Sequence, residues 1–150
     1  MRWQPTCYET TILDDHFEVR KVDDSRWLVR YYERDDKGQE RLLEEFCRES
    51  AVNGKRAIQA RCYEQLKWVQ TQWECTKGGW EVTARVAPIE ASTRFYWWCS
   101  VTRLRGEGQN ATGMAPDLQS AKAMALETAE ALVENVCRIL DKKERNSEGA

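Results

Sequence analysis

Apolar and polar residues alternate along short segments in the first half of the chain. Residues 17–22 and 27–32 are rich in strand-forming residues, and the polar residues 23–25 separate them. Alternation with a period of two around a polar turn predicts a β-hairpin. Residues 41–47 alternate less cleanly and predict a third strand, and residues 8–13 are a candidate for a leading strand.

The spacing of apolar residues changes after Asn53-Gly54. Five apolar residues then recur at intervals of four, four, three and four, namely Ile58, Cys62, Leu66, Val69 and Trp73. This spacing places them on one face of a helix. We therefore predict a helix from residue 54 to about 74.

A second set of segments follows the break at Lys77-Gly78-Gly79. Residues 80–86, 94–102 and 109–114 each predict a strand. Pro116-Asp117 then marks the start of a long helix. Its apolar stripe keeps helical spacing for over five turns and consists of Leu118, Ala121, Ala125, Ala129, Leu132, Val136 and Leu140.

The two halves thus share an order of three strands and one helix. The fold class that we predict is α+β, with two β-β-β-α pseudo-repeats at about 16–74 and 79–141. We expect them to share a mostly antiparallel sheet with both helices packed on one face, because this hides more apolar surface than either unit hides alone. Residues 1–141 then form a single domain, and residues 142–150 form a flexible tail.

Two family resemblances follow from this order. Strand-rich units that each end in a helix resemble the Whirly and PUR folds, whose repeats have four strands and a helix and bind single-stranded nucleic acid. The segment Ser120-Ala121-Lys122-Ala123-Met124-Ala125 resembles the latter part of a double-stranded-RNA-binding domain, where that family carries a lysine cluster. Only Lys122 stands there in this chain, so neither resemblance assigns a functional residue.

Charge and composition narrow the classes of partner. The chain has 150 residues with 23 basic and 25 acidic side chains, so no overall field attracts it to nucleic acid or to a membrane. The amino terminus lacks the apolar core of a signal peptide, and no segment has the apolar length of a membrane span. We therefore expect a cytoplasmic protein whose six cysteines are reduced.

Motifs for catalysis or metal binding are missing from the sequence. The cysteines are at least 13 positions apart, and no pair of cysteines or histidines has metal-ligand spacing. The single histidine, His16, follows two aspartates and is interpreted as a surface residue at the start of a strand. We expect no cofactor, no metal and no enzymatic activity.

Seven tryptophans are the unusual feature of the composition. Trp97 and Trp98 are adjacent on one predicted strand, so their side chains point to opposite sides of the sheet and one faces away from the helices. An outward-facing aromatic residue suits a protein-binding hot spot or a base-stacking platform. The residues that we single out for binding are Trp97, Trp98, Tyr32, Arg30, Arg103 and Arg105.

Two functional hypotheses remain open at this point. The leading one is a small protein-interaction module, an inhibitor or adaptor, that binds a protein partner or a second copy through an aromatic and mixed-charge sheet surface. The alternative is a single-stranded nucleic-acid binding protein with stacking aromatics and strand arginines. The two differ in salt dependence, because only phosphate binding weakens steeply as salt is added.

Overall fold

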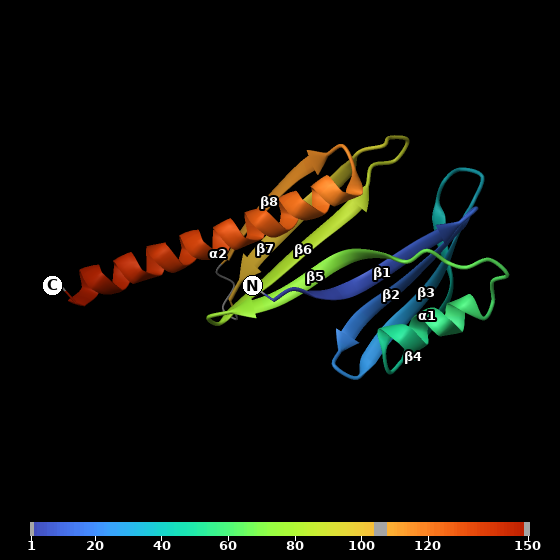
Figure 1. Ribbon diagram of the computed structural model, residues 1–150, viewed down its shortest axis with the longest axis horizontal. Coiled ribbons are helices and arrows are strands. Elements are labelled where there is room, and N and C mark those ends of the chain that lie inside the picture. The colour runs from blue at the N-terminus through green and yellow to red at the C-terminus, as the bar shows by residue number, and fades with distance from the viewer. Residues whose placement is uncertain (1, 104–107, 149–150) are drawn as a thin grey trace. The chain divides into compact units, whose positions relative to one another are not determined.

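Strands followed by a helix make up each of two structural units. The computed structural model describes residues 2–103 and 108–148, with side chains as far as Ile139. The N-terminal unit is Pro5–Thr71, and the C-terminal unit comprises residues 2–4 and 72–148. Figure 1 shows four strands and one helix in each of them.

The N-terminal unit is an antiparallel meander closed by a short helix. Each strand pairs with the next along the chain. Ser50 caps the helix, because its hydroxyl accepts a hydrogen bond from the backbone amide of Asn53 at 3.1 Å. The elements are β1 (Gln4–Ile12), β2 (Asp15–Asp23), β3 (Arg26–Arg34), β4 (Glu40–Arg48) and α1 (Ala51–Gln59).

Helix α1 packs closely on β2 and β3 through a glycine. A Cβ atom at Gly54 would lie 2.9 Å from Val19 Cγ1 and 3.1 Å from Val29 Cγ2. Ile58, one turn further on, is fully buried against the same sheet face together with Phe17. The absence of a side chain at Gly54 therefore sets how near the helix lies to the strands.

The C-terminal unit repeats the order of four strands and one helix with a much longer helix. Gly78 and Gly79 have φ angles of 58° and 83° and make the turn between its first two strands, a conformation that suits glycine. The elements are β5 (Val69–Lys77), β6 (Trp80–Pro88), β7 (Phe95–Thr102), β8 (Gly108–Ala115) and α2 (Leu118–Glu148).

Small residues join α2 to its sheet. Ala121, Ala125 and Ala129 have no exposed surface, and they lie at intervals of four on the helix face that meets the strands. The facing side chains come from alternate positions of β6 and β7, as the period of two along a strand requires. They are Val82, Ala84, Val86, Trp97, Cys99 and Val101.

The predicted α+β class is confirmed. Within residues 2–103 and 108–148, the strands of each unit pair antiparallel and each unit has one helix. Each predicted unit has four strands, however, and not three, because β1 and β5 add a strand to each. No helix within residues 2–103 and 108–148 is long and apolar enough to cross a membrane.

The predicted helix over residues 54–74 is wrong. Helix α1 begins earlier and ends at Gln59, and the second half of the predicted helix is the strand β5. Thr71, Trp73 and Cys75 are buried in alternation along this strand. The apolar residues 66–73 therefore fit a helical spacing by chance. The structure follows the strand period of two, because Trp73 is buried in the core of the sheet.

Other boundaries shift for related reasons. Helix α1 begins at Ala51, three residues before the predicted start at residue 54. Gly78-Gly79 lies in the hairpin between β5 and β6, and the two units divide between Thr71 and Gln72. Helix α2 runs to Glu148 and includes most of the segment predicted as a tail, and residues 149 and 150 are outside the described residues.

Candidate functional site

The sheet face of the C-terminal unit that α2 leaves uncovered carries a group of aromatic and apolar side chains. On β7, Trp97 and Cys99 are buried under α2, so the alternation of the strand turns Tyr96 and Trp98 to the opposite side. We call this side the open face and define it by Arg85, Tyr96, Trp98 and Met114.

Cross-strand pairing places these four side chains next to one another. Arg85 of β6 is opposite Trp98 of β7, and Tyr96 is opposite Met114 of β8. The guanidinium carbon of Arg85 lies 4.9 Å from the centre of the Trp98 ring, a cation–π contact. Tyr96 is 48% exposed and Met114 is 54% exposed, so the apolar part of the open face is available to a partner.

Polar groups surround this aromatic patch. Gln72 and Thr112 continue the cross-strand row of Arg85 and Trp98 on either side. Gln72 Nε2 also donates a hydrogen bond to Glu74 Oε1 at 3.3 Å. An apolar centre with a polar rim is the usual anatomy of a protein-binding surface.

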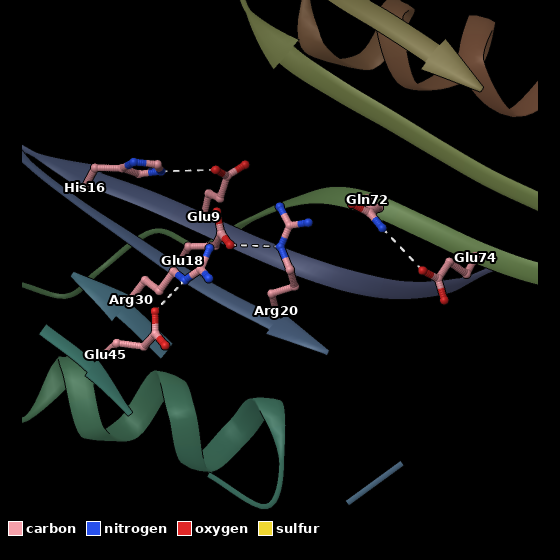
Figure 2. A network of polar contacts seen from close by, with 8 residues as sticks. All are labelled: Glu9, His16, Glu18, Arg20, Arg30, Glu45, Gln72 and Glu74. Atoms are coloured by element: carbon pink, nitrogen blue, oxygen red, sulfur yellow. Dashed lines mark hydrogen bonds and ion pairs between the residues drawn. The ribbon is translucent and has the colours of Figure 1, made fainter. Parts of the chain in front are cut away.

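The N-terminal unit presents a different chemistry on the sheet side away from α1. Here arginine and glutamate side chains pair with one another across and along the strands (Figure 2). Arg20 Nε lies 2.9 Å from Glu18 Oε1, and Arg30 Nε lies 3.0 Å from Glu45 Oε2. Glu18 is only 6% exposed, so its ion pair with Arg20 is largely shielded from solvent. These strand arginines are therefore engaged within the chain.

His16 belongs to the same side of the N-terminal unit and lies between two carboxylates. Its Nε2 is 3.1 Å from Glu9 Oε1, and its Nδ1 is 3.1 Å from Glu40 Oε1. The second contact is an ion pair only, because its geometry does not allow a hydrogen bond. Its ring stacks on Tyr32 at a centroid distance of 5.5 Å.

Opposing effects act on the pKa of His16. Burial lowers it, but the hydrogen bond and charge of Glu9 and the charges of Glu40 and Glu18 outweigh burial and raise the pKa above its usual value. Both ring nitrogens face carboxylates, so His16 is part of a charge cluster. Neither nitrogen is directed at a nucleophile.

Three of the cysteines, Cys7, Cys75 and Cys99, are buried as packing residues, and Cys47 is exposed. All six lie in the described part of the chain, and none of them forms a disulfide. Burial raises the pKa of the Cys7 thiol to about 11 and also raises the pKa of Cys99, which disfavours the nucleophilic thiolate. Within residues 2–103 and 108–148, no three His, Cys, Asp or Glu side chains are grouped to hold a metal ion.

The six residues singled out from the sequence do not form one site. Trp97 is buried in the core of the C-terminal unit, and Trp98 is the outward-facing member of the pair. Arg103 lies over the ring of the buried Trp80 at 4.4 Å. Arg30 and Tyr32 belong to the N-terminal unit, where they contact Glu45 and His16, and Arg105 is outside the described residues.

Sequence reasoning left Tyr96, Met114 and Arg85 out of the candidate site. Tyr96 could have been predicted from the sequence, because it is two positions before Trp98 on the same strand and therefore lies on the same side of the sheet. Arg85 and Met114 required the register of the neighbouring strands, which the sequence does not specify.

Comparison of the chain with protein-family models, curated proteins and solved structures gave no match.

Proposed function

We propose that the chain is a non-catalytic protein-interaction module, acting as an inhibitor or adaptor, and that its open face is the binding surface. The observation that carries this proposal is the cluster of Trp98 and Arg85 beside the exposed side chains of Tyr96 and Met114. The partner is another protein or a second copy of this chain.

The residue types of the open face support a protein partner. Tryptophan, tyrosine, arginine and methionine are the side chains enriched at protein interfaces, and the first three dominate measured hot spots. Methionine adapts its shape to an apolar partner at low cost. The four side chains are fixed on adjacent strands, so little conformational freedom is lost on binding.

The alternative, binding of single-stranded nucleic acid, has one supporting feature, which is the Arg85–Trp98 pair as a stacking platform. The strand arginines Arg20 and Arg30 do not support it, because both are paired with glutamates, and the net charge of the chain is −2. Phosphate binding would have to break these pairs, so protein binding is the better explanation.

Two further expectations belong to this proposal. We propose a cytoplasmic location, and the six cysteines without a disulfide support it, because free thiols suit a reducing compartment. We also interpret the two units as pseudo-repeats, and the shared order of four strands and one helix supports this interpretation.

Site-specific photo-crosslinking tests the proposal. A photoreactive phenylalanine replaces Tyr96 on the open face or, as control, Met124, which is 41% exposed on α2. We expect a discrete protein adduct or a crosslinked dimer from position 96 alone. Equal adducts from both positions, or none from position 96, would contradict the proposed surface.

A titration with single-stranded DNA and RNA oligonucleotides tests the alternative. The tryptophans report binding through their own fluorescence, and we expect no saturable quenching at low salt. Quenching that saturates at low salt and disappears at raised salt would replace the protein-interaction proposal with nucleic-acid binding through Arg85 and Trp98.

A further inference from the structure

A pocket in the N-terminal unit, lined by none of the residues of the open face, contains three arginines. Its volume is about 660 Å³, and it lies where the start of β3, the end of β4 and helix α1 meet. The side chains that give it chemical character are Ser25, Arg26, Arg48, Glu49, Asn53 and Arg56. The start of β3 thus meets the segment from the end of β4 to α1 at one pocket, and three guanidinium groups line it.

The arginines of this pocket are only weakly engaged within the chain. Arg26 pairs with Asp23 at 3.1 Å, but both side chains are exposed, and such pairs contribute little. Arg48 donates a hydrogen bond to the backbone carbonyl of Cys47 at 2.9 Å. In the described part of the chain, Arg56 makes no side-chain hydrogen bond or ion pair.

Guanidinium groups in this number select a phosphate group among common anions. Each planar guanidinium offers parallel N–H donors that match two phosphate oxygens. The Asn53 side-chain amide adds a neutral donor at the same pocket, whereas the Ser25 hydroxyl already donates a hydrogen bond to Asp23 Oδ1 at 3.2 Å. The carboxylates of Glu49 and Asp23 oppose an anion, so the site requires all three arginines to keep a positive balance.

The surroundings of the pocket favour a phosphorylated peptide over a polynucleotide. The ring of Phe46, two positions before Arg48 on β4, is covered by the guanidinium groups of Arg48 and Arg61 at 4.4 and 5.2 Å, so this ring offers no stacking surface for a base. Arg30 lies on the sheet side away from α1 and pairs with Glu45, so it does not extend the cationic surface of the pocket. A single phosphate on a side chain needs neither feature.

We propose that this pocket binds the phosphorylated serine or threonine side chain of a partner peptide. The site does not depend on the open face of the C-terminal unit, so either surface can fail its test while the other holds. Arginine clusters are a recurring means of reading phosphorylated motifs.

Titration of the ¹⁵N-labelled protein with N-acetyl-phosphoserine amide, followed by NMR, tests the pocket. We expect saturable shifts of the side-chain Nε–H signals of Arg26, Arg48 and Arg56, and none with N-acetyl-serine amide. Arg48→Gln combined with Arg56→Gln should weaken binding at least about tenfold, because each charge-assisted hydrogen bond is strong. The matched control, Arg41→Gln on β4, should bind as the native protein does.

Three outcomes would overturn this inference. The first is the absence of shifts in the native protein, and the second is equal binding by the double arginine variant. The third is tighter binding of a single-stranded oligonucleotide than of phosphoserine amide at the same arginines, which would assign the pocket to nucleic acid. The same titration is made with inorganic phosphate. If the protein binds phosphate more weakly than phosphoserine amide, the pocket recognises a phosphorylated side chain and not the free ion.

Discussion

Leu13 is an exposed apolar residue in a conformation that disfavours it. It occupies the first position of the two-residue turn between β1 and β2, has a φ angle of 54° and is 97% exposed. In such turns a positive φ at the first position alone favours glycine, because a Cβ atom is strained there.

Leu13→Gly should therefore raise the free energy of unfolding by about 0.5–1 kcal/mol. Chemical denaturation followed by tryptophan fluorescence measures the change. Asp14→Gly is the matched control, since Asp14 has no positive φ and glycine there should give no gain. A loss of stability in the Leu13 variant would show that the leucine side chain makes a contribution that its exposure hides.

The charge cluster around His16 links stability to pH. Glu9 faces the imidazole from β1, Glu18 lies on its own strand, Glu40 faces it from β4 and also contacts Arg34, and Tyr32 of β3 stacks on it. A raised pKa means that the folded chain binds the histidine proton more tightly than the unfolded chain does.

The contribution of His16 should be complete below pH 6.5, its usual pKa, and should be lost as the pH rises through the raised pKa of the folded state. We expect the difference in unfolding free energy between the native protein and His16→Gln to shrink as the pH rises from 6 to 9. A difference that stays constant over this range would mean that His16 contributes packing alone.

At the scale of elements, α2 depends on small residues for its contact with the sheet. Ala121, Ala125 and Ala129 are fully buried, so the helix backbone lies close to β6 and β7. Well-packed interiors resist added volume as much as they resist cavities.

Ala125→Leu should accordingly lower the free energy of unfolding by about 1–3 kcal/mol. In a chain of this size this lowers the Tm by roughly 3–10 °C, which calorimetry detects. Ala123→Leu adds the same side chain at an exposed position of the same helix and should stay within about 0.5 kcal/mol of the native protein. Equal tolerance of both leucines would contradict close packing at Ala125.

The elements show where the sequence was informative. Six strands and the start of α2 followed from alternation and turn residues, because both are local properties. The connection between β4 and β5 was misread, since Leu66 and Trp73 fit a helical spacing even though Trp73 is buried in a strand. Only tertiary contacts decide between two periods over so short a stretch.

The candidate site was predictable to a smaller extent. Adjacent tryptophans required one outward-facing ring, but local sequence does not say that Trp97 is the buried one. Its indole packs over Gly113 of β8, where a Cβ atom would lie 2.6 Å from the ring. The arginines of the pocket come from a turn, a strand end and a helix, so no local pattern connects them.

At the scale of the whole molecule, the two units differ in what their surfaces offer. The open face of the C-terminal unit has the exposed side chains of Tyr96 and Met114. The sheet side of the N-terminal unit away from α1 carries ion pairs between arginines and glutamates. Apolar burial gives binding energy that salt does not screen, while paired charges contribute specificity more than affinity. The open face is therefore the part of the molecule that we expect to provide affinity.

The most direct test is the affinity of the partner crosslinked at Tyr96 for native protein and for Trp98→Ala, measured at low and raised salt. We predict a loss of at least about tenfold that is nearly independent of salt, with the Tm close to native, since truncated aromatic hot spots cost this much or more. Met124→Ala on α2 should bind as the native protein does. Unchanged affinity of the Trp98 variant, or binding that disappears with salt, would contradict an apolar protein-binding face.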